Sequence, residues 1–386
     1  MSGTFGHLGL TRWPFTIVPD PQYCTFIADR EQLEADLSAL LTTLSRRDAS
    51  FIRLLWAWFG AGKTHALHYL ANRAVEVSRQ PLSNALFTAY TEFPKAARGF
   101  VDLYCSFAAG LDLDSLIESY LEICTSPYSE DFQRDLMISS PDLFSALRVL
   151  AMGESQDQIT ALRWLRGEAL PVAQLRTVGI SQKISGPEHA VRTISALVSM
   201  LGDAARLQGR PGSLLLWMLD EYQRITRTGS RVLNEINTGL HSTFNQCPNG
   251  LALFISFSGK PQKSLPEWFS RELQDRIGRT KVIVLPPMLS DEAMVFIRDL
   301  LAEFRPPGFN HPSPYFPFSE VACKAIAREV EKQGEIKPRA IMQAFDAVLE
   351  EADPKIEVGD MDVISPGFAQ DALAGRVVFE ESKEDW

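Results

Sequence analysis

One short stretch of the sequence constrains the fold more than any other. Residues 51–56 form an apolar run typical of a buried parallel strand, and residues 65–77 have the spacing of a helix. Between them lies a glycine-containing loop, Ala57-Trp58-Phe59-Gly60-Ala61-Gly62-Lys63-Thr64. A strand, a loop ending in Gly-Lys-Thr and a helix are the context in which a phosphate-binding loop operates. This stretch therefore predicts an α/β fold that binds a nucleotide.

Each part of the loop has an expected role toward ATP. Lys63 would reach the β- and γ-phosphates, and the Thr64 hydroxyl would hold Mg²⁺. Ala57 stands where the usual pattern begins with glycine, a position that shapes the turn more than it touches phosphate. At the positive end of the helix dipole, backbone N–H groups would surround the phosphate oxygens. These N–H groups belong to Gly60, Ala61, Gly62, Lys63, Thr64 and His65.

Composition limits the other classes of function. With 386 residues and 45% hydrophobic residues, the chain can build a large core and more than one domain. A net charge of −10 argues against strong stand-alone binding to nucleic acid or to an anionic membrane. The five cysteines are scattered and fit free thiols in a reducing cytosol, without a disulfide framework or a zinc site. No signal pattern or membrane-length apolar run is present, so we expect a cytoplasmic protein.

The rest of the chain divides into four parts. Short apolar runs separated by helical patterns predict a five-stranded parallel sheet, with strands at 51–56, 85–90, 214–219, 251–257 and 281–285. The second and third strands are unusually far apart, so we expect a helical insertion at about 95–210. Beyond the sheet, a small helical lid is predicted from helices at 290–303, 319–333 and 338–351. The expected domains are an arm (1–28), the α/β domain (29–289), the lid (290–352) and a tail (353–386) with an acidic, mobile end.

Two carboxylates follow the predicted strand at 214–219. Asp220 and Glu221 would lie at the carboxyl edge of the sheet, where open α/β sheets bind their ligands. There Asp220 would hold the Mg²⁺ shell through water, and Glu221 would polarise the water that attacks the γ-phosphate. Alone, the pair could be a solvated strand end.

With these two motifs in place, the sequence resembles the AAA+ ATPases over most of residues 27–351. After the strand at 251–257, the resemblance implies a small polar residue that senses the γ-phosphate: Ser258 first and Ser256 second, unless these serines belong to an ordinary turn. Residues 271–279 carry Arg271, Arg276 and Arg279. In this family an arginine here reaches the neighbouring subunit's nucleotide, and Arg276 is best placed, although the three could form a solvated face.

Two further places support the same resemblance. Pro338 suits the first turn of a helix, and the family's Pro-Arg pair at this point implies that Arg339 contacts the bound nucleotide. A surface position for this arginine is the alternative. The start of the first helix resembles the segment that passes the adenine, which implies roles for Ile27 and Arg30.

Within the family, the simple lid with its Pro-Arg pair looks like the origin-recognition and initiator-type branch. A weaker similarity links residues 161–168 to ATP-binding proteins of BREX-type phage-defence systems. Initiator-type proteins usually continue into a winged-helix DNA-binding domain, for which little sequence remains after about residue 352. Any DNA contact would then come from the AAA+ body, with Lys95 and Arg98 as candidates, or from a partner.

These features together predict an ATPase that uses ATP and Mg²⁺ and assembles into a homo-oligomeric ring or spiral. Hydrolysis would drive or time the remodelling of a partner effector acting on DNA, in phage defence or a mobile element. A nucleotide-gated scaffold or loader with little hydrolysis is the first alternative. A small-molecule kinase is the second, and the lid and the arginine cluster argue against it.

Overall fold

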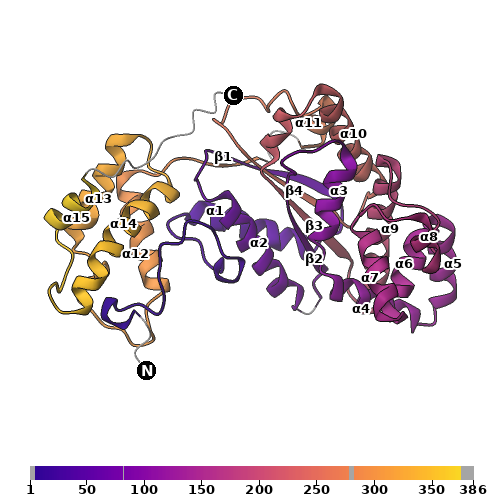
Figure 1. Cartoon of the computed structure of the whole chain (residues 1–386), viewed down its shortest axis with the longest axis horizontal. Coiled ribbons are helices and arrows are strands. Elements are labelled where there is room, and N and C mark those ends of the chain that lie inside the picture. The colour runs from indigo at the N-terminus through magenta and orange to yellow at the C-terminus, as the bar shows by residue number, and fades with distance from the viewer. Residues whose placement is uncertain (1–4, 81, 278–281, 375–386) are drawn as a thin grey trace. The chain divides into compact units, whose positions relative to one another are not determined.

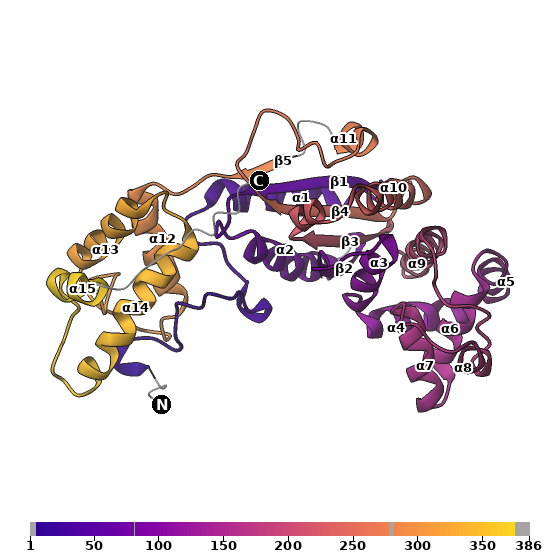
Figure 2. The same cartoon turned by 45° about the horizontal axis from the view of Figure 1, so that its top comes forward.

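A five-stranded parallel sheet with strand order β2-β3-β4-β1-β5 organises the α/β part of the chain (Figures 1 and 2). The computed structural model describes residues 5–80, 82–277 and 282–374. The strands are β1 (Phe51–Ala57), β2 (Ala85–Glu92), β3 (Ser213–Asp220), β4 (Leu251–Ser258) and β5 (Val282–Leu285). All five predicted strands are therefore confirmed, although Lys281 lies outside the described residues.

The buried strands explain why the sequence pattern was readable. Every residue of β3 and of β4 is buried, because both strands have a neighbour on each side and helices over the sheet. Register pairs Glu92, the last residue of β2, with Asp220, the last residue of β3. The carboxyl ends of these neighbouring strands thus coincide, and the polar residues that end them share one edge of the sheet.

The long connection between β2 and β3 is helical, as predicted. Its largest helix, α9 (Pro187–Leu207), packs against β3 and against α10 (Ser230–Gln246). Figure 2 shows α4 to α8 gathered in a group beside α9. The helices of the insertion are α3 (Phe100–Ala109), α4 (Leu113–Cys124), α5 (Ser129–Ser139), α6 (Pro141–Met152), α7 (Ser155–Leu165), α8 (Val172–Thr177) and α9.

The remaining elements of the α/β part flank the strands. Along the chain, α1 (Glu31–Leu44) precedes β1 and α2 (Lys63–Ser78) follows it. A 3₁₀ helix, η3 (Tyr222–Arg227), follows β3 directly, and α11 (Arg271–Ile277) precedes β5. The N-terminal region carries two short 3₁₀ turns, η1 (Gly6–Leu8) and η2 (Pro21–Tyr23).

The C-terminal helices build a second hydrophobic core with the N-terminal arm. The helices are α12 (Ser290–Glu303), α13 (Glu320–Gln333), α14 (Pro338–Glu357) and α15 (Pro366–Leu373). Phe15 of the arm packs against Phe318 and Phe345, and the Trp13 indole N–H donates to an Asp346 carboxylate oxygen at 2.6 Å. The arm aromatics therefore serve packing.

The end of α14 and the presence of α15 differ from the prediction. Continuing past Glu351, α14 reaches Glu357 with Pro354 inside its last turn, and α15 follows within the region expected to be a tail. The helix was predicted to end earlier because proline disfavours the interior of a helix. The buried Ala352 and Ile356 hold this turn on the second core.

The described residues form two compact units. One comprises those of Met1–Ala35, Ala57–Tyr69 and Leu285–Trp386, and the other those of Asp36–Trp56 and Leu70–Val284. The phosphate loop and the lid helices belong to the first unit, and β2, β3, β4 and the insertion to the second. In the described parts of the chain, no helix has the length and apolar character needed to span a bilayer.

Candidate functional site

The loop after β1 has the backbone shape that its glycines predict. Gly60 has φ +74° and Gly62 has φ +93°, values that favour glycine strongly over residues with a Cβ atom. A Cβ atom at Gly62 would meet no atom within 4 Å, so this glycine is required by backbone conformation alone. Ala61 between them is buried, and its N–H points back to the Trp58 carbonyl at 3.3 Å.

Lys63 and Thr64 are the first two residues of α2, whereas the sequence placed the helix start at residue 65. The difference follows from the loop, because Gly62 ends the left-handed turn and the next residue is free to become helical. The Lys63 side chain is only 5% exposed, and its ammonium donates to the Trp58 carbonyl oxygen at 3.2 Å. The Lys63 side chain therefore folds back onto the phosphate loop to which it belongs.

His65, the third residue of α2, is fixed by the N-terminal arm. Its Nε2 lies 2.7 Å from the Phe26 carbonyl oxygen and therefore carries the proton, while Nδ1 lies 3.4 Å from the Cys24 sulfur. Burial lowers the pKa of His65 and raises the pKa of the Cys24 thiol to about 12. The imidazole is thus a neutral link between arm and helix, and only the backbone N–H of His65 is left for the predicted phosphate role.

The first turn of α14 contacts the phosphate loop within the same unit. The Arg339 backbone N–H donates to the Gly60 carbonyl oxygen at 3.2 Å, and the Lys337 ammonium lies 5.5 Å from the centre of the Trp58 ring. The Arg339 guanidinium is exposed. The sequence identified Arg339 but missed Lys337, whose contact depends on an aromatic residue at a position that the phosphate-loop pattern does not specify.

Arg30 is half-buried, and two nitrogens of its side chain are buried without a hydrogen-bond partner. Its Nε and one terminal nitrogen make no hydrogen bond in the structure, and burial lowers its pKa despite the nearby carboxylates of Glu292 and Asp29. Burial and the Glu292 charge raise the pKa of Asp29 to about 6. Ile27, the other residue predicted to pass the adenine, is half-buried. Two buried N–H donors without a partner fit the prediction that a polar ligand lies against Arg30.

In the second unit, Asp220 is held by three donors at the end of β3. It is 1% exposed, and it accepts hydrogen bonds from the Tyr90 hydroxyl at 3.2 Å, the Glu221 N–H at 2.8 Å and the Ser256 hydroxyl. Such donors fix the orientation of the carboxylate. An oriented carboxylate supported by a second layer of donors is the arrangement that a metal shell needs.

Glu221 has a strained backbone directly after the strand. Its φ of +59° is in the left-handed region, a conformation that costs a non-glycine residue energy and tends to occur at functional sites. Its carboxylate accepts from the Gln223 side-chain amide at 3.0 Å and pairs with Arg224 at 3.4 Å. Neither Gln223 nor Arg224 was singled out from the sequence, because both are polar residues in a stretch of mixed polarity after Asp220.

The two serines at the end of β4 have different roles. The Ser256 hydroxyl donates to Asp220, so this residue supports the carboxylate. The hydroxyl of Ser258 is buried without a hydrogen-bond partner, and its backbone N–H donates to the side-chain amide oxygen (Oε1) of Gln223 at 2.9 Å. A buried hydroxyl without a partner is costly unless a ligand or water completes it, which fits the preference for Ser258 as the sensor.

The predicted basic residues lie on exposed surface. Arg276 donates to the Asn245 side-chain carbonyl at 2.9 Å and lies over the Phe244 ring, both on α10. Arg271 begins α11 and is exposed, and Arg279 lies outside the described residues. Lys95 and Arg98, in the loop after β2, are also exposed.

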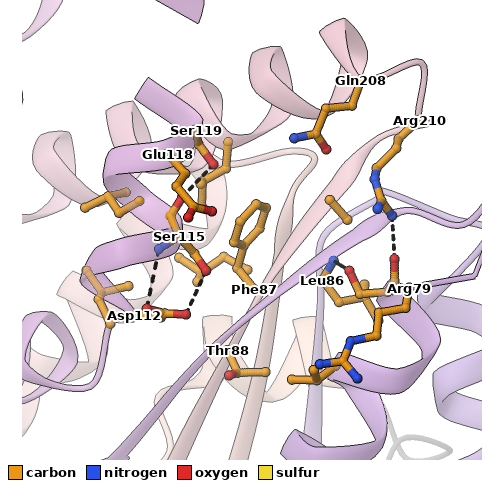
Figure 3. A pocket seen from close by; sticks show the side chains of 17 residues that line it. Arg79, Leu86, Phe87, Thr88, Asp112, Ser115, Glu118, Ser119, Gln208 and Arg210 are labelled. Atoms are coloured by element: carbon orange, nitrogen blue, oxygen red, sulfur yellow. Dashed lines mark hydrogen bonds between the residues drawn. The ribbon is translucent and has the colours of Figure 1, made fainter. Parts of the chain in front are cut away.

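A pocket of about 290 Å³ lies elsewhere in the second unit (Figure 3). It covers the amino half of β2 and is walled by the end of α2, by α4 and by α9, far along β2 from Glu92. Asp112 and Ser115 bond to each other at its rim, and Arg210 donates to the Ser78 carbonyl oxygen at 2.5 Å. The pocket contains none of the predicted site residues.

The sequence matches no protein-family model and no curated protein. Its fold does match solved structures. The ORC2 protein of Aeropyrum pernix, solved as ADPNP–ADP complexes, aligns at TM-score 0.51 and 15% identity over 96% of this chain and 72% of that one. The chain has the fold of the initiator-type AAA+ ATPases.

Other initiator structures align more weakly. The ORC1 protein of Aeropyrum pernix in complex with DNA gives TM-score 0.49 at 14% identity, over 94% of this chain and 69% of that one. Domain III of the DnaA initiation protein of Thermotoga maritima gives 0.44 at 13% identity, over 90% and 92%. The AAA+ fold predicted from the sequence is confirmed by the match to the ORC2 protein and by the five-stranded parallel sheet. The similarity to BREX-type proteins has no counterpart among these structures.

Proposed function

We propose that this AAA+ chain binds ATP with Mg²⁺ and hydrolyses it. The observation that carries the proposal is the loop, in which two glycines at positive φ lead into Lys63 and Thr64 at the start of a 16-residue helix. Backbone N–H groups at a helix N-terminus, beside a buried lysine, favour a phosphate chain. Arg30 in the same unit supplies a buried donor that a nucleotide would satisfy.

The residues present also fit Mg²⁺. Magnesium usually keeps several waters and binds one or two carboxylates together with the substrate phosphates. Among the described residues, no cluster of three or more histidine, cysteine or acidic side chains could hold a metal by itself. We assign the Thr64 hydroxyl and the Asp220 carboxylate to Mg²⁺, which when bound would neutralise charge on the phosphates.

In the proposed reaction, Glu221 orients and polarises the attacking water, and Ser258 donates its unpartnered hydroxyl to the γ-phosphate. Arg339 would contact the same nucleotide from the lid, so that hydrolysis changes how α14 sits on the loop. Arg276, exposed on α11, would complete the site of a neighbouring copy in a homo-oligomeric ring or spiral.

We also propose the kind of partner on which this ATPase acts. Because the chain is acidic, DNA would be reached through the assembly, with Lys95 and Arg98 as contacts, or through an effector protein. A role in phage defence or a mobile element rests on the resemblance of residues 161–168. In the structure these residues lie in and after α7, where Trp164 is buried and Arg163 pairs with Glu168 at 2.7 Å.

Nucleotide titration tests the binding step. The wild type should bind ATP–Mg²⁺, and Lys63→Ala should weaken the affinity by at least about tenfold, since a charge-assisted hydrogen bond contributes about 1.5–3 kcal/mol. Lys332→Ala removes an exposed lysine on α13 that pairs with Glu329, and it serves as the matched control. Equal affinity in wild type and Lys63→Ala would contradict the assignment.

A further inference from the structure

Gln223 connects the acidic residue after β3 to the end of β4. Its side-chain Nε2 donates to a Glu221 carboxylate oxygen at 3.0 Å, and its Oε1 accepts from the Ser258 backbone N–H at 2.9 Å. The side chain is 4% exposed, so water does not compete for either bond. One buried amide thus bridges the residue proposed to polarise water and the residue proposed to sense phosphate.

The direction of this amide is fixed by its two partners. A backbone N–H can only donate, so the atom facing Ser258 must be the amide oxygen. The amide nitrogen then faces Glu221, whose ionised carboxylate can only accept. A flipped amide would place two donors together at Ser258 and two acceptors together at Glu221. The bridge therefore holds the carboxylate in a single orientation.

The Glu221 oxygen that accepts from Gln223 has Arg224 as a second partner. Arg224 pairs with the same carboxylate at 3.4 Å and donates to the Glu92 carboxylate at 3.0 Å and to the Phe93 carbonyl oxygen at 2.9 Å. Because β3 lies between β2 and β4 in the sheet, Arg224 ties Glu221 toward the end of β2 while Gln223 ties it toward the end of β4.

We propose that Gln223 is the positioning residue for Glu221. It holds the carboxylate in the orientation that hydrolysis requires and couples that orientation to the position of Ser258. This inference rests on the proposed function. In it, Gln223 acts through Glu221 and makes no contact with the nucleotide, so its loss should lower the catalytic rate without weakening ATP binding.

The test uses the full chain with Gln223→Met, which keeps the length of the side chain and removes both hydrogen bonds. We expect kcat to fall about 10- to 100-fold, as for loss of a group that orients a catalytic residue, with KM for ATP unchanged. Gln274→Met is the matched control. Gln274 lies on α11, and the substitution removes the hydrogen bond from its side-chain amide to the Phe269 carbonyl oxygen. This control should leave kcat unchanged.

Two further measurements separate positioning from a general loss of structure. In a double-mutant cycle, Gln223→Met should slow a Glu221→Gln enzyme by less than twofold, because the residue acts through Glu221. Deuterium exchange of the Ser258 amide should be faster in Gln223→Met than in wild type and in the control, at equal melting temperature.

The outcomes distinguish this inference from the proposed function. Unchanged kcat in Gln223→Met, or a loss that multiplies with that of Glu221→Gln, would overturn the positioning role. Unchanged exchange at Ser258 would overturn the bridge. If wild type hydrolyses no ATP while the exchange is accelerated in Gln223→Met, the bridge stands, and both the proposed hydrolysis and the positioning role fall.

Discussion

The backbone N–H of Arg339 donates to the carbonyl oxygen of Gly60 at 3.2 Å, so the first turn of the lid helix α14 rests directly on the phosphate loop. A Cβ atom at Gly60 would lie 3.1 Å from the Cβ atom of Arg339. Loop and helix are therefore in close contact within one unit, and a change in the loop conformation must move the start of α14.

Gly60→Ala should damage both stability and ATP binding. The substitution forces a Cβ atom into the left-handed region at φ +74°, which costs roughly 1–2 kcal/mol, and crowds Arg339 as well. We expect a lower free energy of unfolding and an ATP affinity reduced about tenfold. Chemical denaturation and nucleotide titration measure the two effects.

Gly359→Ala is the matched control for this prediction. Gly359 has φ +81°, and a Cβ atom there would meet nothing within 4 Å. The control should lose similar stability through backbone strain and keep the wild-type ATP affinity. Wild-type affinity in Gly60→Ala would contradict the role of the loop.

The two serines of β4 should respond in opposite ways. Ser256→Ala leaves the buried Asp220 carboxylate short of a donor, so we expect a loss of about 1–3 kcal/mol in the free energy of unfolding. Ser258→Ala removes a buried hydroxyl that has no partner, so stability should stay within about 0.5 kcal/mol while kcat falls. A large stability loss in Ser258→Ala, or none in Ser256→Ala, would reverse these assignments.

His65 should make the protein less stable in mild acid. Burial lowers its pKa below the ordinary value of 6.5, so the unfolded chain takes up the proton first as the pH falls. The stability contributed by the neutral ring is complete above pH 6.5 and is lost as the pH falls through the lowered pKa. His65→Gln, which keeps an amide donor, should lose less stability than wild type over this window. If the free energy of unfolding falls equally with pH in wild type and in His65→Gln, the prediction is contradicted.

Arg276 should act across a subunit boundary. Arg276→Ala should lose hydrolysis and keep ATP affinity, whereas Lys63→Ala loses both. Mixed in equal amounts, the two inactive proteins should regain up to about a quarter of the wild-type rate, since randomly assembled rings contain some intact shared sites. Full turnover by Arg276→Ala alone would show that this arginine has no such role.

The sheet was predictable because its strands are buried on both faces. A continuous apolar run such as that of β3, ending in Asp220 and Glu221, is typical of a central parallel strand, and the Gly-Lys-Thr loop marks the carboxyl edge of the sheet. The α2 start was placed two residues late because the loop geometry, not residue preference, decides where the helix begins.

The support around the site could not be predicted in the same way. Gln223, Arg224 and Ser256 act through contacts between strand ends that are distant in sequence. Their residue types are ordinary for a turn or a strand, so only their three-dimensional neighbours reveal a role. The same holds for Lys337 and the Trp58 ring.

Steady-state ATP hydrolysis by wild type and Glu221→Gln, with and without duplex DNA and with the assembled mass measured alongside, tests the central claim most directly. Glu329→Gln, which changes an exposed carboxylate on α13 that pairs with Lys332, is the control. The account predicts Mg²⁺-dependent hydrolysis that falls to a small residual rate in Glu221→Gln and that accompanies ATP-dependent oligomers. Nucleotide-dependent assembly with negligible hydrolysis in every condition would contradict it and would indicate a nucleotide-gated scaffold instead.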